Sequence, residues 1–146
     1  QMIARLVESG VTPVVAPLTH DGEGHILNTN ADTIAKTVAC AVARDYEVTL
    51  IYAFEKRGVL SNPDDDNSVI PTITRADFDR YVADGVIAGG MIPKVECCTN
   101  AIRAGVRKVF IIDGRVPHAL LIETLTDEGA GTMFKKEIEG NYVPRS

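Results

Sequence analysis

A lysine that follows a pair of glycines is the first candidate for chemistry in this sequence. The run Gly89-Gly90-Met91-Ile92-Pro93-Lys94 leads into an apolar stripe at helical spacing, and glycines before a helix let a phosphate approach free backbone N–H groups. Because a lysine in the first turn opposes the helix dipole, Lys94 is either an exposed lysine in a poorly optimised turn or a functional group. As a functional group it would stabilise negative charge on a transferring phosphoryl group.

A second polar segment, Asn28-Thr29-Asn30-Ala31-Asp32, leads into another predicted helix. Asn28 presents both a donor and an acceptor to a small polar ligand, and Asp32 would hold a nearby ammonium group. The alternative is that Asn30 only caps the helix while Asp32 complements the positive end of its dipole.

Other sites with recognisable chemistry are not predicted. The three aspartates from Asp64 to Asp66 indicate a solvated loop over residues 58–71, with a cation site as the weaker alternative. The adjacent Cys97 and Cys98 lack the spacing of a structural zinc site, so all three cysteines are expected to be reduced core thiols. Phosphate-loop, dinucleotide and nucleophile-elbow signatures are absent, and the three histidines are interpreted as ordinary surface or packing residues.

The elements that position these residues alternate between helices and strands. This alternation predicts an α/β layered domain with a largely parallel sheet and ligands at the carboxyl ends of its strands, near Asn28, residues 55–60 and residues 113–115. The expected helices are a short one ending at Gly10, one after Asn30 with Ile34, Val38, Ala41 and Val42 on its apolar face, one capped by Thr74 and Asp77, one from Pro93, and one over 117–125. The expected strands span 11–18, buried on both faces, and 47–54, 109–112 and 131–134, with a hairpin-like turn at 21–24.

Composition limits the class of protein further. The chain has 146 residues, 45% of them hydrophobic and 24% charged, which is typical of one globular domain and not of a disordered chain. A net charge of −5 argues against nucleic acid as a partner, since such binding rests on phosphate neutralisation by Lys and Arg. The longest apolar runs have the length of strands, so no membrane span is expected.

Three long runs carry a specific resemblance: residues 13–17 through 28–32, residues 83–96, and residues 111–121. Together they closely resemble the acetylglutamate kinases of the amino acid kinase family, and they match its carboxyl-terminal half. The resemblance implies a three-layer α/β/α sandwich in which residues 1–146 form the ATP-binding half. The amino-terminal half, which holds most of the acyl-amino-acid site, would be absent, and we expect the chain alone to be inactive.

The implied reaction moves the ATP γ-phosphoryl group to the side-chain carboxylate of N-acetyl-L-glutamate in arginine biosynthesis, with Mg²⁺ brought in by ATP and no metal held by the protein. By resemblance, Lys94 and Asp32 are the catalytic positions, and Asn28 and Asn30 bind the substrate. The implied nucleotide-binding residues are Glu55, Lys56, Arg57, Gly58, Val59, Leu60, Val86, Ile87, Ala88 and Met91. Relatives usually have an aspartate opening this loop, whereas this chain has the run Phe54-Glu55-Lys56-Arg57-Gly58. Its longer carboxylate and two extra cations could still hold the ribose and phosphates.

The run from Thr126 to Thr132 resembles the arginine-inhibited members of the family, which implies L-arginine as a feedback inhibitor bound near Glu123 and Gly129. We also expect a homo-oligomer and a cytoplasmic location, or a plastid or mitochondrion in a eukaryote. Three alternatives stay open. They are a non-catalytic nucleotide-binding or arginine-sensing module, a kinase for a related acyl-glutamate such as N-succinylglutamate, and a kinase acting on aspartate, glutamate or carbamate.

Overall fold

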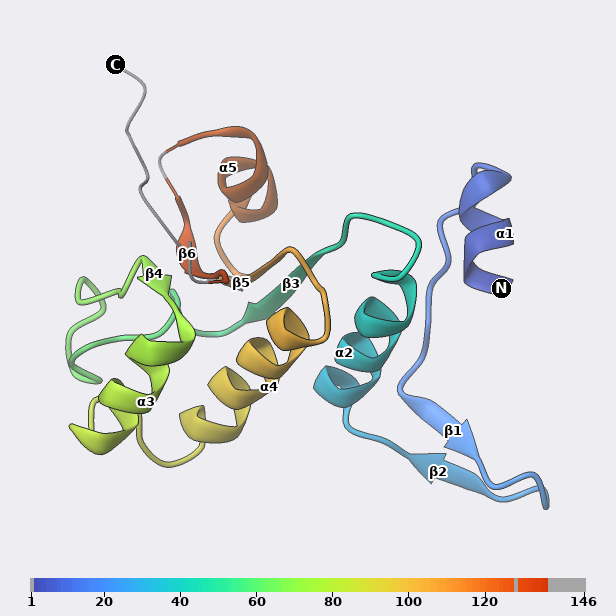
Figure 1. Ribbon diagram of the computed structural model, residues 1–146, viewed down its shortest axis with the longest axis horizontal. Coiled ribbons are helices and arrows are strands. Elements are labelled where there is room, and N and C mark those ends of the chain that lie inside the picture. Colours follow the sequence, from blue (N-terminus) through green and yellow to red (C-terminus); the bar gives the residue numbers. More distant parts are fainter. Residues whose placement is uncertain (1, 128, 137–146) are drawn as a thin grey trace.

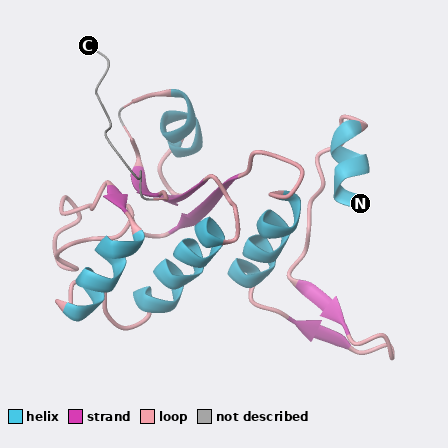
Figure 2. Ribbon diagram, viewed as in Figure 1, coloured by secondary structure: helices cyan, strands magenta, loops and turns pink. Residues whose placement is uncertain are grey.

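A mixed sheet with helices on both faces forms the centre of the molecule (Figures 1 and 2). The computed structural model describes residues 2–127 and 129–136. Within them, no helix has the length and apolar character needed to cross a membrane. The elements are α1 (Met2–Glu8), β1 (Leu18–His20), β2 (Ile26–Asn28), α2 (Ala31–Val42), β3 (Thr49–Phe54), β4 (Thr72–Ile73), α3 (Arg75–Ala83), α4 (Met91–Arg103), β5 (Lys108–Asp113), α5 (Ala119–Leu125) and β6 (Gly131–Phe134).

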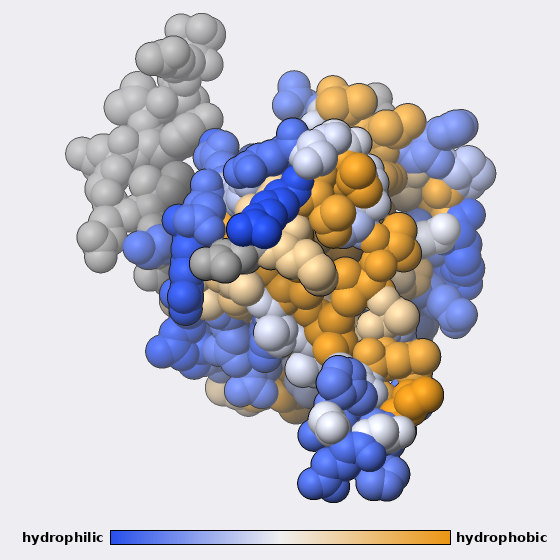
Figure 3. All heavy atoms as spheres, turned by 90° about the vertical axis from the view of Figure 1, so that its right-hand side faces the viewer, coloured by the Kyte–Doolittle hydropathy of each residue, from blue (hydrophilic) through white to orange (hydrophobic). Residues whose placement is uncertain are grey.

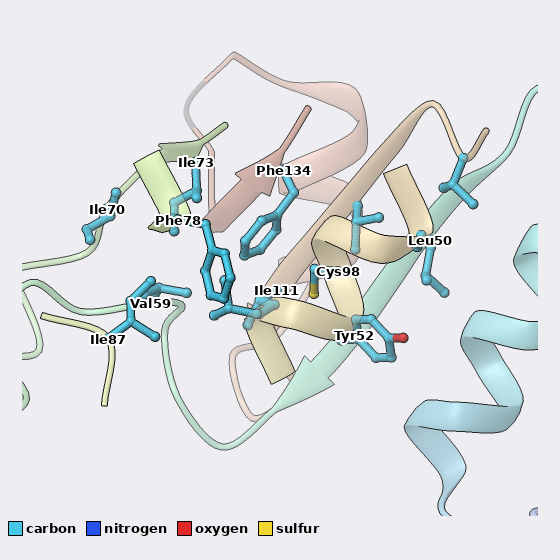
Figure 4. Packing of buried hydrophobic residues seen from close by; sticks show 14 of the residues in the cluster. Leu50, Tyr52, Val59, Ile70, Ile73, Phe78, Ile87, Cys98, Ile111 and Phe134 are labelled. Atoms are coloured by element: carbon cyan, nitrogen blue, oxygen red, sulfur yellow. The ribbon is translucent and has the colours of Figure 1, made fainter. Parts of the chain in front are cut away.

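The main sheet has the strand order β3-β5-β6-β4. β3 pairs with β5 and β4 pairs with β6 in parallel, whereas β5 and β6 are antiparallel. Successive residues of a strand point to opposite faces, and β5 therefore contributes side chains to two hydrophobic clusters, one on each face of the sheet. Val109 and Ile111 pack with α2, α3 and α4, and Phe110 and Ile112 pack with Ala119 of α5. The predicted three-layer α/β/α class with a largely parallel sheet is confirmed, and Figure 4 shows the larger cluster.

Local hydrogen bonds set the starts of two helices where the sequence predicted them. The side chain of Asn30 accepts a hydrogen bond from the Thr33 N–H and caps α2. Thr74 and Asp77 form a capping box at α3, in which each side chain bonds the other residue's backbone N–H. Helix α4 begins at Met91, two residues before the predicted start at Pro93.

Two predictions about buried surface are wrong. Residues 11–17 form no strand and Val14 is 94% exposed, because β1 begins only at Leu18 and pairs with β2 in a separate two-stranded ribbon. Helix α2 buries Ala39 and turns Ala35 and Cys40 toward the core, so its packing face is not the expected Ile34 stripe. Helix α2 contacts α4, and this contact decides which face of α2 is buried.

The loop between β3 and β4 is also more ordered than expected. The aspartates of residues 64–66 are exposed as predicted, but Val59, Leu60 and Ile70 are buried, and Leu60 forms a bridge with Val69. The two-residue strand β4 was not predicted. All three cysteines are free, as expected, with Cys98 fully buried and the other two half-buried.

Candidate functional site

An open cleft of about 680 Å³ lies at the carboxyl ends of β3 and β5, beside the first turn of α4. The parallel pairing of β3 with β5 brings Phe54 opposite Asp113, so the residues after both strands meet at one edge of the sheet. Three cationic side chains line this cleft, namely Lys56, Lys94 and Arg115. With one carboxylate in the lining, that of Glu55, the cleft has an excess of positive charge, at the edge where ligands collect in open α/β sheets.

Lys94 and Asp32, far apart in the sequence, come together beside this cleft. The Lys94 Nζ atom lies 3.7 Å from Asp32 Oδ2, and the two side chains are 37% and 31% exposed. The same Nζ lies 3.6 Å from the centroid of the Phe54 ring. The lysine is thus held by a carboxylate and an aromatic face while part of it still faces solvent.

The N–H groups of the first residues of α4 are already engaged in local hydrogen bonds. The N–H groups of Met91 and Ile92 donate to the carbonyl oxygens of Ala88 and Gly89, both at 3.2 Å. Pro93 has no N–H group. These three positions therefore offer no free N–H group to a phosphate.

A smaller pocket of about 180 Å³ adjoins the cleft and shares Lys56 and Met91 with it. Most residues that the sequence assigned to a nucleotide meet here, although they come from the loop after β3 and from the segment that leads into α4. The lining residues are Lys56, Gly58, Val59, Leu60, Pro63, Gly85, Val86, Ala88 and Met91.

Two residues of the predicted nucleotide set lie elsewhere. Ile87 is 1% exposed and belongs to the main core, because its backbone turns back to donate its N–H to Tyr81 O at 3.0 Å. Arg57 lines a different cavity, on the α5 side of the sheet, and its guanidinium lies 3.5 Å from Asn67 Oδ1. Glu55, by contrast, lines the cleft.

Thr132 of β6, which the sequence did not single out, anchors the loop of the smaller pocket. Its buried hydroxyl accepts a hydrogen bond from Val59 N at 2.8 Å and donates to Ile70 O at 2.7 Å. Gly58 has a φ of +155°, and a Cβ atom there would lie 2.6 Å from Thr132 Oγ1. Only glycine fits this position without strain. The contact joins segments distant in sequence, so residue spacing gave no signal for it.

Arg115 is fixed at the edge of the cleft by Asp113. Its Nε and Nη2 atoms donate to the two carboxylate oxygens at 2.9 and 2.8 Å, and its backbone N donates to Oδ1 at 3.0 Å. These bonds lower the pKa of Asp113 to about 2. Since Asp113 is 4% exposed and the Arg115 side chain is 65% exposed, the carboxylate anchors the guanidinium and leaves it accessible from the cleft.

The two asparagines of the predicted substrate segment are exposed, and neither lines the cleft or the smaller pocket. Asn28 ends β2, while the Oδ1 atom of Asn30 is engaged in capping α2. Their role as substrate ligands remains a prediction. Of this segment, Asp32 is the residue that the structure brings to Lys94.

Glu123 and Gly129, predicted as effector residues, line one cavity of about 740 Å³ between α5 and the sheet. Asp127 lines it as well, together with the cations Arg57 and Lys108. A Glu123 carboxylate oxygen also accepts the Ala130 N–H and so ties α5 to the loop before β6.

The comparisons with known proteins agree on one family. Residues 1–113 match the model of the amino acid kinase family. The acetylglutamate kinase of Bacteroides thetaiotaomicron is 61% identical over 110 residues, which is 75% of this chain and 43% of that kinase. The acetylglutamate kinase of Bacteroides fragilis is 57% identical over 135 residues, which is 92% of this chain and 48% of that kinase. The chain thus spans less than half the length of either kinase.

A solved structure supports the fold independently. The N-acetylglutamate synthase of Neisseria gonorrhoeae, complexed with coenzyme A and N-acetyl-glutamate, superposes with a TM-score of 0.82 at 24% identity. The match covers 94% of this chain and 31% of that protein. At this identity the likeness concerns the fold.

Proposed function

The chain belongs to the amino acid kinase family, and on that premise we propose that it is the ATP-binding, carboxyl-terminal half of an acetylglutamate kinase. The whole enzyme would transfer the γ-phosphoryl group of ATP to the side-chain carboxylate of N-acetyl-L-glutamate, in arginine biosynthesis. The carboxylate oxygen would form the new P–O bond, and the bond to the leaving ADP oxygen would break. The products are an acyl phosphate and ADP.

The observation that carries this proposal is the convergence of Lys94 and Asp32 at a cleft lined by two further cations. Phosphoryl transfer requires positioning and charge stabilisation more than covalent chemistry from the protein. Lys94 would contact the transferring phosphoryl oxygens, and Asp32 would orient the ammonium group. Lys56 and Arg115 would hold the other phosphates, and Mg²⁺ would enter with ATP.

The smaller pocket is the proposed adenosine site. Val59, Leu60 and Val86 give it an apolar lining, and it meets the cationic cleft at Lys56 and Met91. A base in the pocket would therefore place its phosphates in the cleft. With about 180 Å³ of space, the pocket suits a planar base better than a whole nucleotide.

Calorimetric titration with the magnesium complex of a non-hydrolysable ATP analogue tests this assignment. We expect saturable binding by the 146-residue chain, weakened by Lys94→Ala and unchanged by Lys36→Ala, which removes a lysine of α2 outside the cleft. Equal binding by both variants would contradict the role of Lys94. If the folded chain does not bind the analogue, the proposed nucleotide site does not lie in this half.

A second experiment tests the reaction itself. The complementary half of the Bacteroides fragilis kinase would be supplied with this chain, ATP and N-acetyl-L-glutamate, and the acyl phosphate would be trapped with hydroxylamine. Formation of the hydroxamate supports an acetylglutamate kinase. Turnover of N-succinyl-L-glutamate in its place would favour the related acyl-glutamate kinase, and binding without any turnover would favour a nucleotide-binding module.

We infer a second, regulatory role for the cavity beneath α5, because both predicted effector residues and Asp127 line it together. The two carboxylates would pair with the guanidinium of L-arginine. Titration should show saturable binding of L-arginine but not of its uncharged isostere L-citrulline, with weaker arginine binding by Glu123→Gln. Equal binding of both ligands would contradict this role.

A further inference from the structure

Two aromatic residues of β3 link Lys94 to Asp32, so that each of the four residues contacts the next in a ring. The Tyr52 and Phe54 rings lie on the same face of the strand and stack with centroids 5.6 Å apart and an interplanar angle of 9°. The Phe54 ring contacts the Lys94 ammonium, and the Tyr52 hydroxyl donates to the backbone carbonyl of Asp32 at 3.1 Å. Lys94 and Asp32 complete the set.

Phe54 holds the ammonium in a way that a carboxylate cannot. The distance from Lys94 Nζ to Asp32 Oδ2, 3.7 Å, is longer than a hydrogen bond, so the ion pair alone leaves the lysine loosely placed. The distance of 3.6 Å to the Phe54 centroid lies well within the range of a cation–π contact. An aromatic face attracts the cation through its quadrupole and brings no counter-charge, so the positive charge stays available to a phosphoryl group.

Tyr52 fixes the two helices that carry the charged pair. Its hydroxyl bonds Asp32 in α2 and lies 3.4 Å from Cys97 Sγ, in α4 one turn after Lys94. The residue is 5% exposed, and Figure 4 shows its hydroxyl directed out of the core on the side of α2. Burial raises the pKa of Tyr52 well above its ordinary value, which keeps the hydroxyl protonated as a donor.

We propose that Tyr52 and Phe54 are positioning residues that set the Lys94 ammonium beside Asp32 at the mouth of the cleft. Phe54 acts on the lysine side chain directly, and Tyr52 acts on the helix starts from which both charged residues project. The role in phosphoryl transfer rests on the proposed function, whereas the geometry of the contact can be tested without it.

The contact itself is tested by NMR of the 146-residue chain. An ammonium over a ring places the lysine ε-methylene protons in the ring current, so we expect upfield-shifted Lys94 ε-protons, assigned by their loss in Lys94→Arg. Phe54→Leu should return them to ordinary positions and Phe54→Trp should keep them shifted. Unshifted Lys94 protons in the parent chain, or a shift unaffected by Phe54→Leu, would overturn the proposal.

The effect on the ligand is tested by comparing affinities for the ATP analogue and for ADP. If Phe54 places Lys94 against the terminal phosphate, Phe54→Leu should reduce the preference for the triphosphate by about three- to tenfold, and Phe54→Trp should restore it. A change of packing alone would weaken both nucleotides equally and would overturn the positioning role. Tyr81→Leu is the matched control, since it removes a cation–π contact with Arg80 outside the cleft.

Tyr52→Phe removes the hydroxyl group and keeps the ring, so it tests their contributions separately. The stack on Phe54 should persist, and with it the shifted Lys94 protons, while the triphosphate preference should fall because α2 loses its tie to β3. An unchanged preference would overturn the role of Tyr52. If the Lys94 protons behave as expected but no variant binds nucleotide, the positioning contact stands and the proposed nucleotide site fails.

Discussion

Residues 2–28 and residues 49–134 both contain continuous apolar runs, but only the second region buries them. Val109 to Ile112 lie between β3 and β6 with helices on both faces, and each of the four is at most 6% exposed. Val14 and Ile26 are 94% and 77% exposed, and α1 buries none of its residues. Figure 3 shows the resulting apolar band on the side of the molecule formed by α1 and the β1–β2 ribbon. An apolar run thus specifies burial only where neighbouring elements are present to cover it.

The sharpest test makes the same substitution in both regions. Ile111→Ala should lower the free energy of unfolding by about 2–5 kcal/mol, because it leaves a cavity in a fully buried position. Ile26→Ala should change it by less than about 0.5 kcal/mol. Urea denaturation followed by circular dichroism measures both. A comparable loss in the two variants would show that the ribbon unfolds together with the core.

Glycines extend the comparison from side chains to the backbone. Gly58→Ala should destabilise the chain by about 2–4 kcal/mol, since the new Cβ meets Thr132 at a strained φ. Gly24 in the ribbon also has a positive φ, +95°, but nothing lies within 4 Å of an added Cβ. Gly24→Ala should therefore leave global unfolding unchanged, as measured by the urea midpoint. We also expect Gly58→Ala to weaken nucleotide binding, because the anchored loop lines the smaller pocket.

These contrasts also mark what the sequence could predict. Asn30 and Thr74 were recognised as caps because their bonds reach only three residues along the chain. Lys94 was recognised because it breaks a local rule of helix electrostatics. Phe54 and Thr132 were not recognised, since their contacts depend on strand register and on segments far apart in sequence. The burial expected for residues 11–18 failed for the same reason, because periodicity does not report whether a partner strand is present.

The exposed apolar band should make the chain associate with itself. Contiguous apolar surface of this kind promotes association in water. Replacing both Val14 and Ile26 with lysine should move the sedimentation profile toward the monomer without lowering the urea midpoint. Leu125→Lys is the control, since Leu125 is 76% exposed but lies on α5. A monodisperse monomer in the parent chain, or a larger effect of the control, would contradict the prediction.

The smallest expected effect is a difference in pH dependence between two acidic side chains. Arg115 lowers the pKa of Asp113 from an ordinary 3.8 to about 2, so the ionised pair stabilises the folded state above about pH 4 and this contribution is lost between pH 4 and pH 2. Arg115→Met should therefore lower the urea midpoint at pH 7 but not near pH 2. In the ribbon, the Glu23 amide and the His25 ring lower the pKa of Asp21. We expect the ribbon to unfold independently of the core, so His25→Gln should leave the midpoint unchanged at every pH. A shift equal to that of Arg115→Met would contradict this independence.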